Sequence, residues 1–183
     1  RWGASWGLEV PLYFAPDGFE EAPTLKRSNA FDLVGAECKA VRESVGLLDI
    51  SGFSRFEVTG PGAEAWLDHI MASRLPKPDR AKLAPMLSPE GKLKGDVTVF
   101  NWGDGTWWIM GSYFRREWHM RWFHDHMAAN VSVHDISDLT VGFSLSGPNS
   151  RDVLEKLTDG PIADLPFMGC GTFDIGLVTA KVG

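Results

Sequence analysis

The stretch LKGDVTVFNWGDGTWWIM, residues 93–110, has the pattern of a β-hairpin. Leu93 to Asn101 predicts a strand, in which successive side chains point to opposite faces of a sheet. Gly103-Asp104-Gly105 predicts a turn, and Thr106 to Met110 predicts the partner strand of a hairpin.

The flanking segments extend the hairpin into a known order of elements. Arg55 to Thr59 alternates like a half-buried strand, Gly60-Pro61 marks a helix start, and Ala63 to Met71 carries an apolar helical stripe. After the hairpin, Tyr113 to Ala128 predicts a helix and Val131 to Ile136 a closing strand. The order β-α-β-β-α-β predicts an α+β, ferredoxin-like fold with a split β-α-β unit.

One internal repeat suggests a second subdomain. The stretches EVTGPGAEAWLDHI (57–70) and SLSGPNSRDVLEKL (144–157) share a strand, a Gly-Pro pair and a helix. We therefore expect a second, similar subdomain to begin near Leu139 and to be incomplete at Gly183.

The amino-terminal part divides into an arm and a helix. Residues 1–30 are rich in Trp, Pro and Gly and lack a sustained period, which predicts a connecting arm. Over residues 31–48, apolar side chains recur at steps of three and four, which predicts an amphipathic helix docked on a core. The predicted parts are an arm (1–30), a first subdomain (31–138) and an incomplete second one (139–183).

Composition excludes several partners. A formal charge of -6, from 24 acidic and 18 basic residues, argues against a nucleic-acid partner. No apolar run reaches the roughly 20 residues that span a bilayer, so we expect no membrane association. Cys38 and Cys170 have neither zinc nor disulfide-framework spacing, which favours a reducing, cytoplasmic location. The start at Arg1, without an initiator Met, suggests a piece of a longer polypeptide.

The central strand carries a carboxylate that needs an explanation. Alternation places Leu93, Val97 and Val99 in the core and Lys94, Asp96, Thr98 and Phe100 on the opposite face. Aspartate is a poor strand former. Asp96 is therefore either an edge-strand acid facing water or an acid lining a cleft, and the pattern alone leaves both open.

Three stretches resemble successive signatures of the glycine-cleavage T-protein (aminomethyltransferase) family. They are DISGFSRFEVTGPGAEAWLD (49–68), PMLSPEGKLKGDVTVF (85–100) and SLSGPNSRDVL (144–154), in the family's order and spacing. The segment RWGASWGLEVPLYFAP (1–16), with its run from Trp6 to Pro11, is similar to the connector between flavin and folate parts in the dehydrogenase-fused branch. Dimethylglycine and sarcosine dehydrogenases represent that branch.

The resemblance implies a tetrahydrofolate site. The family folds as a three-part cloverleaf with a ferredoxin-like first part. Asp96 matches the acid that contacts the reacting nitrogens of the folate, and is the implied catalytic residue. Phe53 and Phe100 match apolar and aromatic folate contacts, and Met86 is a further candidate for the pocket wall. The implied partners are tetrahydrofolate, a small amine-derived one-carbon donor and an upstream flavin domain, with FAD bound only there.

The chain departs from the glycine-cleavage members at particular positions. They carry Gly-Gly-x-x-Asp-Asp where this chain has Gly91-Lys92-Leu93-Lys94-Gly95-Asp96, and an Asn where it has Gly111. A Tyr-Thr-Gly-Glu segment, whose Glu grips the pterin, would follow Gly183. A non-catalytic module that keeps the fold for binding or assembly is the alternative function.

No metal site is expected. His119, His124 and His126 fall in one predicted helix, but their spacings of five and two residues do not share a face. A zinc site on a helix requires two histidines four residues apart.

Overall fold

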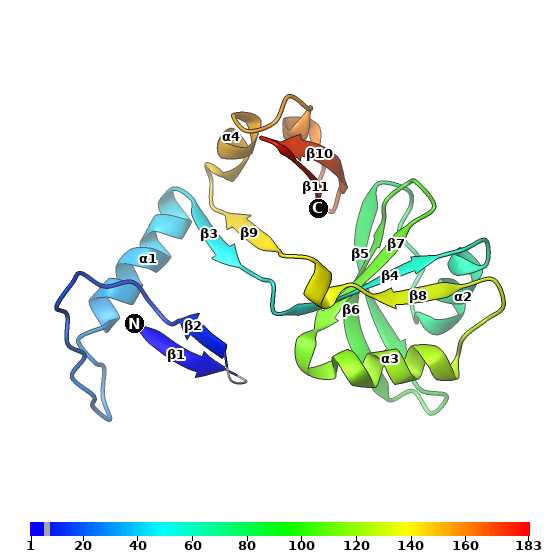
Figure 1. The fold of residues 1–183 in the computed structure, drawn as a ribbon, viewed down its shortest axis with the longest axis horizontal. Helices are drawn as coiled ribbons and strands as arrows, with labels where there is room; N and C mark the ends of the chain where they lie inside the picture. Colours follow the sequence, from blue (N-terminus) through cyan, green and yellow to red (C-terminus); the bar gives the residue numbers. More distant parts are fainter. Residues whose placement is uncertain (6–7) are drawn as a thin grey trace. The chain divides into compact units, whose positions relative to one another are not determined.

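The computed structural model describes residues 1–5 and 8–183, which form two units (Figure 1). The first comprises Arg1–Leu47 with Leu145–Ser150, and the second comprises Leu48–Ser144 with Arg151–Gly183. Trp6 and Gly7, which belong to the predicted connector run, lie outside the described residues. The division into an arm and two subdomains stays a prediction.

The first unit contains a hairpin that the sequence pattern did not predict. Strand β1 (Trp2–Ser5) pairs antiparallel with β2 (Leu8–Pro11), with Trp2 opposite Pro11. Strands of four residues are too short to display a hydrophobic period, so the segment resembled an irregular arm. The aromatic ring of Tyr13 is buried beside Phe19, with ring centroids 6.3 Å apart.

Helix α1 (Phe31–Glu43) is shorter and more exposed than expected. None of its residues is buried, so the prediction of a helix docked on a core is wrong for the described chain. It also ends before the predicted Leu48, because the chain enters β3 (Gly46–Asp49), which pairs with β9 (Phe143–Ser146). Pairing with a distant segment here overrides the local helical pattern.

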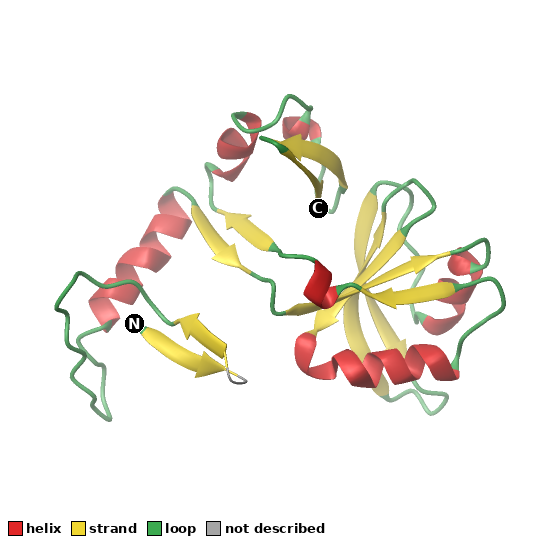
Figure 2. Ribbon diagram, in the orientation of Figure 1, coloured by secondary structure: helices red, strands yellow, loops and turns green. Residues whose placement is uncertain are grey.

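The second unit is built on a five-stranded sheet in which every neighbouring pair is antiparallel (Figure 2). Its strands, in the spatial order β5-β6-β7-β4-β8, are β5 (Arg80–Leu87), β6 (Leu93–Asn101), β7 (Trp107–Ser112), β4 (Phe53–Thr59) and β8 (Ser132–Asp135). Strand β7 lies between β4 and β6, which gives the predicted split β-α-β arrangement. The α+β, ferredoxin-like prediction is confirmed, with β5 as an extra strand at the edge.

Two features of the sheet differ from the pattern-based prediction. Strand β5 was missed because Pro85 interrupts its ladder, which is tolerated at an edge. Leu93, expected in the core, is 61% exposed. The register between β5 and β6 shifts at Met86/Leu87, so the alternation that places Val97 inside does not extend to Leu93.

Helices α2 (Ala63–Ile70) and α3 (Arg116–Asp125) pack on one face of the sheet. The ring of Phe123 contacts those of Trp66 and Phe56, with centroids 5.8 and 5.2 Å apart. The predicted core residues Trp66, Leu67, Val97 and Val99 are all buried here. The side chains of β4, β6 and β7 that point away from α2 and α3 form the opposite face of the sheet. Neither of these two helices covers that face.

The predicted repeat is visible as local structure. Strand β4 and helix α2 flank Gly60, and β9 and helix α4 (Ser150–Glu155) flank Gly147, with φ of 108° and 122°. These positive φ values favour glycine at both positions. Short helices η1 (Tyr113–Arg115), η2 (Ser137–Leu139) and η3 (Ile162–Asp164) complete the helical set.

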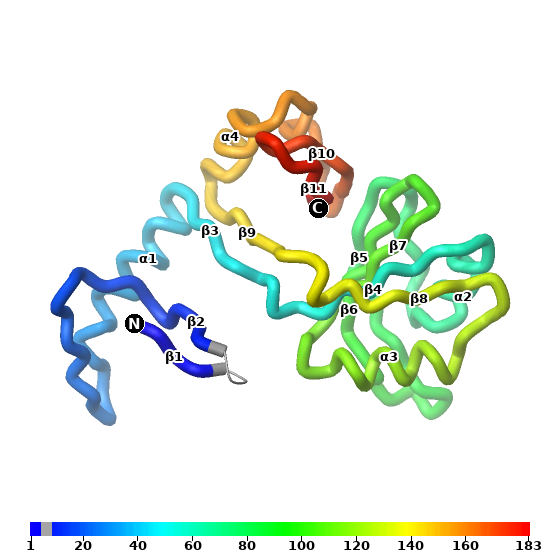
Figure 3. The backbone as a smooth tube through the Cα atoms, viewed as in Figure 1, coloured from blue at the N-terminus to red at the C-terminus, as the bar shows by residue number. Residues whose placement is uncertain are grey.

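The carboxy-terminal segment attaches to the outer edge of β5 (Figure 3). The amide of Ala81 donates to the Met168 carbonyl at 2.8 Å, and that of Cys170 donates to the Asp79 carbonyl at 3.0 Å. Strands β10 (Gly171–Ile175) and β11 (Val178–Val182) follow as an antiparallel pair. Within the described chain, no helix has the length and apolar character needed to cross a bilayer.

Candidate functional site

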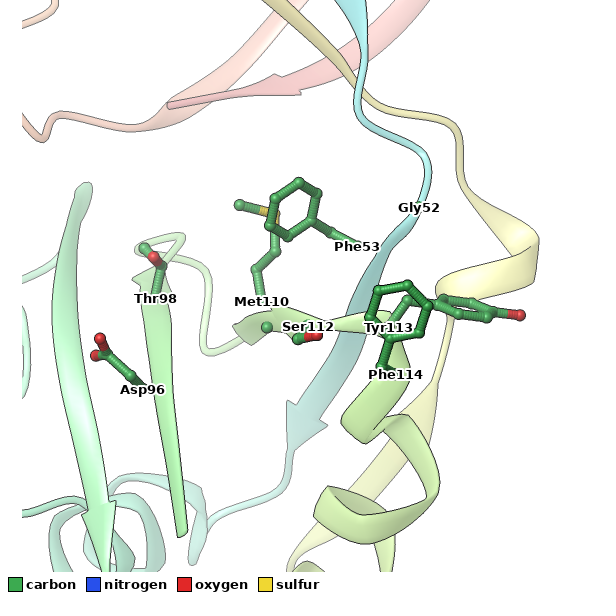
Figure 4. A pocket seen from close by; sticks show the side chains of 9 residues that line it. Gly52, Phe53, Asp96, Thr98, Met110, Ser112, Tyr113 and Phe114 are labelled. Atoms are coloured by element: carbon green, nitrogen blue, oxygen red, sulfur yellow. The ribbon is translucent and has the colours of Figure 1, made fainter. Parts of the chain in front are cut away.

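A cavity of about 440 Å³ lies on the sheet face opposite α2 and α3 (Figure 4). Its walls come from the loop before β4, from β6, and from the end of β7 with η1. The lining residues are Gly52, Phe53, Asp96, Thr98, Met110, Gly111, Ser112, Tyr113 and Phe114. One carboxylate therefore lies among apolar and aromatic side chains.

Asp96 occupies the position that the sequence left undecided. It lies on β6, which has β5 on one side and β7 on the other, so it is not an edge-strand acid. Val97 points to the core while Asp96 lines the cavity. Within the described chain, the Asp96 carboxylate has no hydrogen bond or ion pair, which leaves its oxygens available to a cationic or proton-donating ligand.

A buried arginine holds the loop that carries Phe53. The Arg55 guanidinium is 4% exposed and donates to the main-chain carbonyls of Ile50 at 2.9 Å and of Ser51 and Phe53 at 3.3 Å each. Burial lowers the pKa of Arg55 from its ordinary value. These three bonds fix the turn, so Phe53 is presented to the cavity on an ordered backbone.

An ionic cluster holds the opposite wall. Arg116 pairs with Asp135 and, at 2.6 Å, with Asp138. The Tyr113 hydroxyl donates to Asp138 at 3.2 Å and accepts from the Arg116 guanidinium at 3.0 Å. Hydrogen bonding to Asp135 raises the pKa of Arg116. Tyr113 and the adjoining Phe114 are thus anchored where β7 leads into α3.

Among the four predicted site residues, the structure brings two together. Asp96 and Phe53 line the same cavity. Phe100 shares the sheet face of Asp96 but does not line this cavity, because its ring stacks on Trp102 with centroids 5.2 Å apart and planes 6° apart. Met86 is fully buried in the core on the opposite face, so its assignment to the pocket wall is not supported.

The remaining lining residues were missed by the sequence analysis. Thr98 lies opposite Met110 in the β6–β7 ladder, and residues directly opposite on one face are neighbours. Extending the predicted hairpin register would therefore have identified Met110. Tyr113 and Phe114 follow β7, and the sequence analysis included them in the predicted helix. Nothing in the helical pattern distinguished them as residues of a cavity wall.

The family model described as the GCVT N-terminal domain matches residues 1–183, the whole chain. The chain belongs to the GCVT N-terminal domain family. This assignment confirms the resemblance drawn from the three sequence motifs.

Curated relatives and a solved structure agree with the family. Dimethylglycine dehydrogenase, mitochondrial, from Mus musculus is 30% identical over 166 residues, covering 88% of this chain and 19% of the relative. An aminomethyltransferase from Geobacillus kaustophilus is 29% identical over 155 residues, covering 83% of this chain and 43% of the relative. The glycine cleavage system aminomethyltransferase T from Bartonella henselae has the same fold, with a TM-score of 0.75, 19% identity, and coverage of 93% of this chain and 43% of that one.

The chain spans less than half the length of each of these relatives. Family membership therefore places it as an aminomethyltransferase-like domain related to enzymes. Membership alone does not assign the activity of a complete protein to this chain.

Proposed function

We propose that this chain is the tetrahydrofolate-dependent one-carbon transfer module of a flavin-dependent N-methyl amine dehydrogenase, such as a dimethylglycine or sarcosine dehydrogenase. The observation that supports this most is the unpaired Asp96 carboxylate in the 440 Å³ cavity. Its position in the family motif supports the same role.

The chemistry calls for such a carboxylate. The N5 lone pair of tetrahydrofolate attacks the carbon of an amine-derived iminium, and the carbon–nitrogen π electrons pass to the donor nitrogen. The donor nitrogen then takes up a proton and departs as an amine, N10 closes on the carbon with loss of its own proton, and methylene-tetrahydrofolate results once the N5 proton has left. A fixed carboxylate stabilises the cationic nitrogen and can accept that proton. Asp96 would serve both purposes.

The cavity walls suit the rest of the ligand. Phe53, Tyr113 and Phe114 offer flat apolar surfaces for a pterin or aminobenzoyl ring. The same walls would keep water from the reactive iminium. The residues present thus fit folate on this side, and Asp96 with Phe53 is the pair that would hold its reacting end.

The proposed setting is a larger chain. An upstream flavin domain would carry FAD and oxidise the amine, while this domain would capture the released carbon. Both cysteines, Cys38 and Cys170, are free. We propose the cytoplasm as the compartment.

The test uses the full-length protein with Asp96→Asn, which keeps the shape of the side chain and removes its charge. Loss of a positioned acid-base group costs about 10²- to 10⁴-fold in rate, or roughly 3–5 kcal/mol of barrier. Amine oxidation, followed with an artificial electron acceptor, should stay at the wild-type rate, while methylene-tetrahydrofolate falls and formaldehyde rises. Asp68→Asn on the exposed side of α2 is the matched control.

The opposite outcome would assign a structural role to Asp96. If Asp96→Asn and Asp96→Ala both couple oxidation to folate at the wild-type yield, Asp96 is a structural residue. The domain would then be a non-catalytic module that keeps the fold for binding or assembly.

A further inference from the structure

A second cavity of about 190 Å³ adjoins the first through Asp96 and Ser112. It opens where the sheet ladder stops. The β6–β7 pairing runs from Asn101↔Trp107 to Thr98↔Met110 and does not continue to Asp96 and Ser112. The two strand ends therefore leave a gap through which the buried side of α3 is reached.

His119 lies at the bottom of this cavity. Its side chain is 1% exposed, and neither ring nitrogen forms a hydrogen bond of good geometry among the described residues, although a main-chain hydrogen-bonding interaction with Lys94 acts to raise its pKa. A neutral imidazole carries one N–H donor and one acceptor, and leaving both unpaired in the interior costs free energy. Even with the main chain of Lys94 near one ring nitrogen, the other nitrogen keeps this cost, and because the ring lines the cavity it can be offered to a ligand there.

Arg115 lines the same cavity from η1. Its guanidinium is exposed and forms no ion pair in the described parts of the chain. Arg115 is close enough to His119 to disfavour protonation of the imidazole. The cavity therefore carries an unpaired negative charge on Asp96, an unpaired positive charge on Arg115, and a neutral imidazole with the Ser112 hydroxyl between the strand ends.

We propose that this second cavity binds the amino-acid part of the one-carbon donor, with the donor's cationic nitrogen at Asp96 and its carboxylate at Arg115, Ser112 and His119. The proposal rests on the proposed function, and it names the donor class as a zwitterionic, amino-acid-derived iminium. A simple anion would be repelled by Asp96 and a simple amine by Arg115. A ligand with both charges satisfies both residues.

The dimensions agree with a small donor. A water molecule in the liquid occupies about 30 Å³, so the cavity holds the equivalent of about six waters. The adjoining first cavity, at about 440 Å³, offers more than twice that space for a ring system such as a pterin. The two ligands would then meet at Asp96, one of the two residues that both cavities share.

The test compares two donors in the full-length protein with tetrahydrofolate. Formaldehyde condenses with glycine, or with ethylamine, and each condensation releases water and yields an iminium with or without a carboxylate. Formation of methylene-tetrahydrofolate is followed after subtraction of the protein-free rate, which bypasses amine oxidation. The variant is Arg115→Gln, and Arg121→Gln on α3 is the matched control, because Arg121 is exposed and lines neither cavity.

The wild-type protein should prefer the glycine-derived donor. Arg115→Gln should raise the KM for that donor by roughly 10- to 100-fold, the range expected for a charge-assisted hydrogen bond, while the ethylamine-derived donor is unaffected. Arg121→Gln should behave as wild type with both donors.

Two results would overturn this inference alone. In one, Arg115→Gln leaves the KM for the glycine-derived donor unchanged. In the other, it slows both donors equally while Asp96→Asn still abolishes transfer. Absence of protein-dependent transfer from either donor would overturn this inference and the proposed function together.

Discussion

The imidazole of His119 occupies the space that a side chain at Gly95 would need. A Cβ atom on residue 95 would lie 2.8 Å from Nε2 of His119 and 2.5 Å from Cε of Met86. The glycine immediately before the candidate catalytic residue Asp96 is therefore required by packing against α3. Gly95 on the core side of β6 and Asp96 on its cavity side are consecutive residues, so packing at the first fixes the backbone position of the second.

Gly95→Ala should destabilise the protein by about 1–3 kcal/mol, the usual cost of inserting an atom into a packed core. Denaturant unfolding would measure the change. Gly35→Ala is the control, because a Cβ there meets no atom within 4 Å and the residue lies in helix α1. An unchanged midpoint for Gly95→Ala would show that His119 moves aside without cost.

His119→Leu should leave stability at neutral pH unchanged or slightly higher. The substitution removes two ring nitrogens that form no hydrogen bond of good geometry and puts an apolar side chain of similar volume in the interior. Thermal unfolding at pH 7.5, about one unit above the ordinary pKa of histidine, would measure it. A large loss of stability would mean that the imidazole has partners in solution.

The same variant should change the response to acid. Burial, followed by the nearby charge of Arg115, lowers the pKa of His119 below its ordinary value of 6.5. Below pH 6.5 the unfolded chain thus binds a proton that the folded chain resists, so this site removes stability as the pH falls from 6.5 towards the lowered pKa. His119→Leu should unfold less steeply with acid over that window than wild type, and equal slopes would contradict this account.

Arg55→Met should destabilise the second unit by roughly 2–4 kcal/mol, because three main-chain carbonyls lose their donor. Folate affinity should fall as well, since the loop that presents Phe53 loses its anchor. Arg74→Met, at an exposed position, is the matched control. Intact folate affinity in a folded Arg55→Met protein would separate the loop from the binding site.

Phe53→Ala should weaken folate binding and destabilise the protein less than loss of a core phenylalanine. The side chain is 43% exposed and lies outside the core cluster, so the stability cost should stay below the roughly 3–5 kcal/mol of a fully buried ring, whereas an aromatic contact with a bound ring contributes about 0.5–1.5 kcal/mol. Calorimetric titration of tetrahydrofolate into the full-length protein would measure the change. Phe167→Ala, which alters an exposed ring outside both cavities, should leave the affinity unchanged.

The local sequence pattern was enough to predict those elements in which one face is buried along its whole length. The bounds of β6, the helix start after Gly60-Pro61 and the burial of Trp66 and Val97 all followed from alternation, helical spacing and turn chemistry. These signals survive in a single sequence because each depends on neighbours a few residues away.

The tertiary structure decided what depends on segments far apart in the chain. Residues Gly46–Asp49 became a strand because Phe143–Ser146 pairs with them, although the helical period continued to Leu48. Phe100 does not line the cavity because its ring stacks on that of Trp102. Met86 does not line it because its side chain packs in the core. The second cavity opens where the β6–β7 ladder stops at Thr98, a geometric outcome that alternation of residue types does not encode.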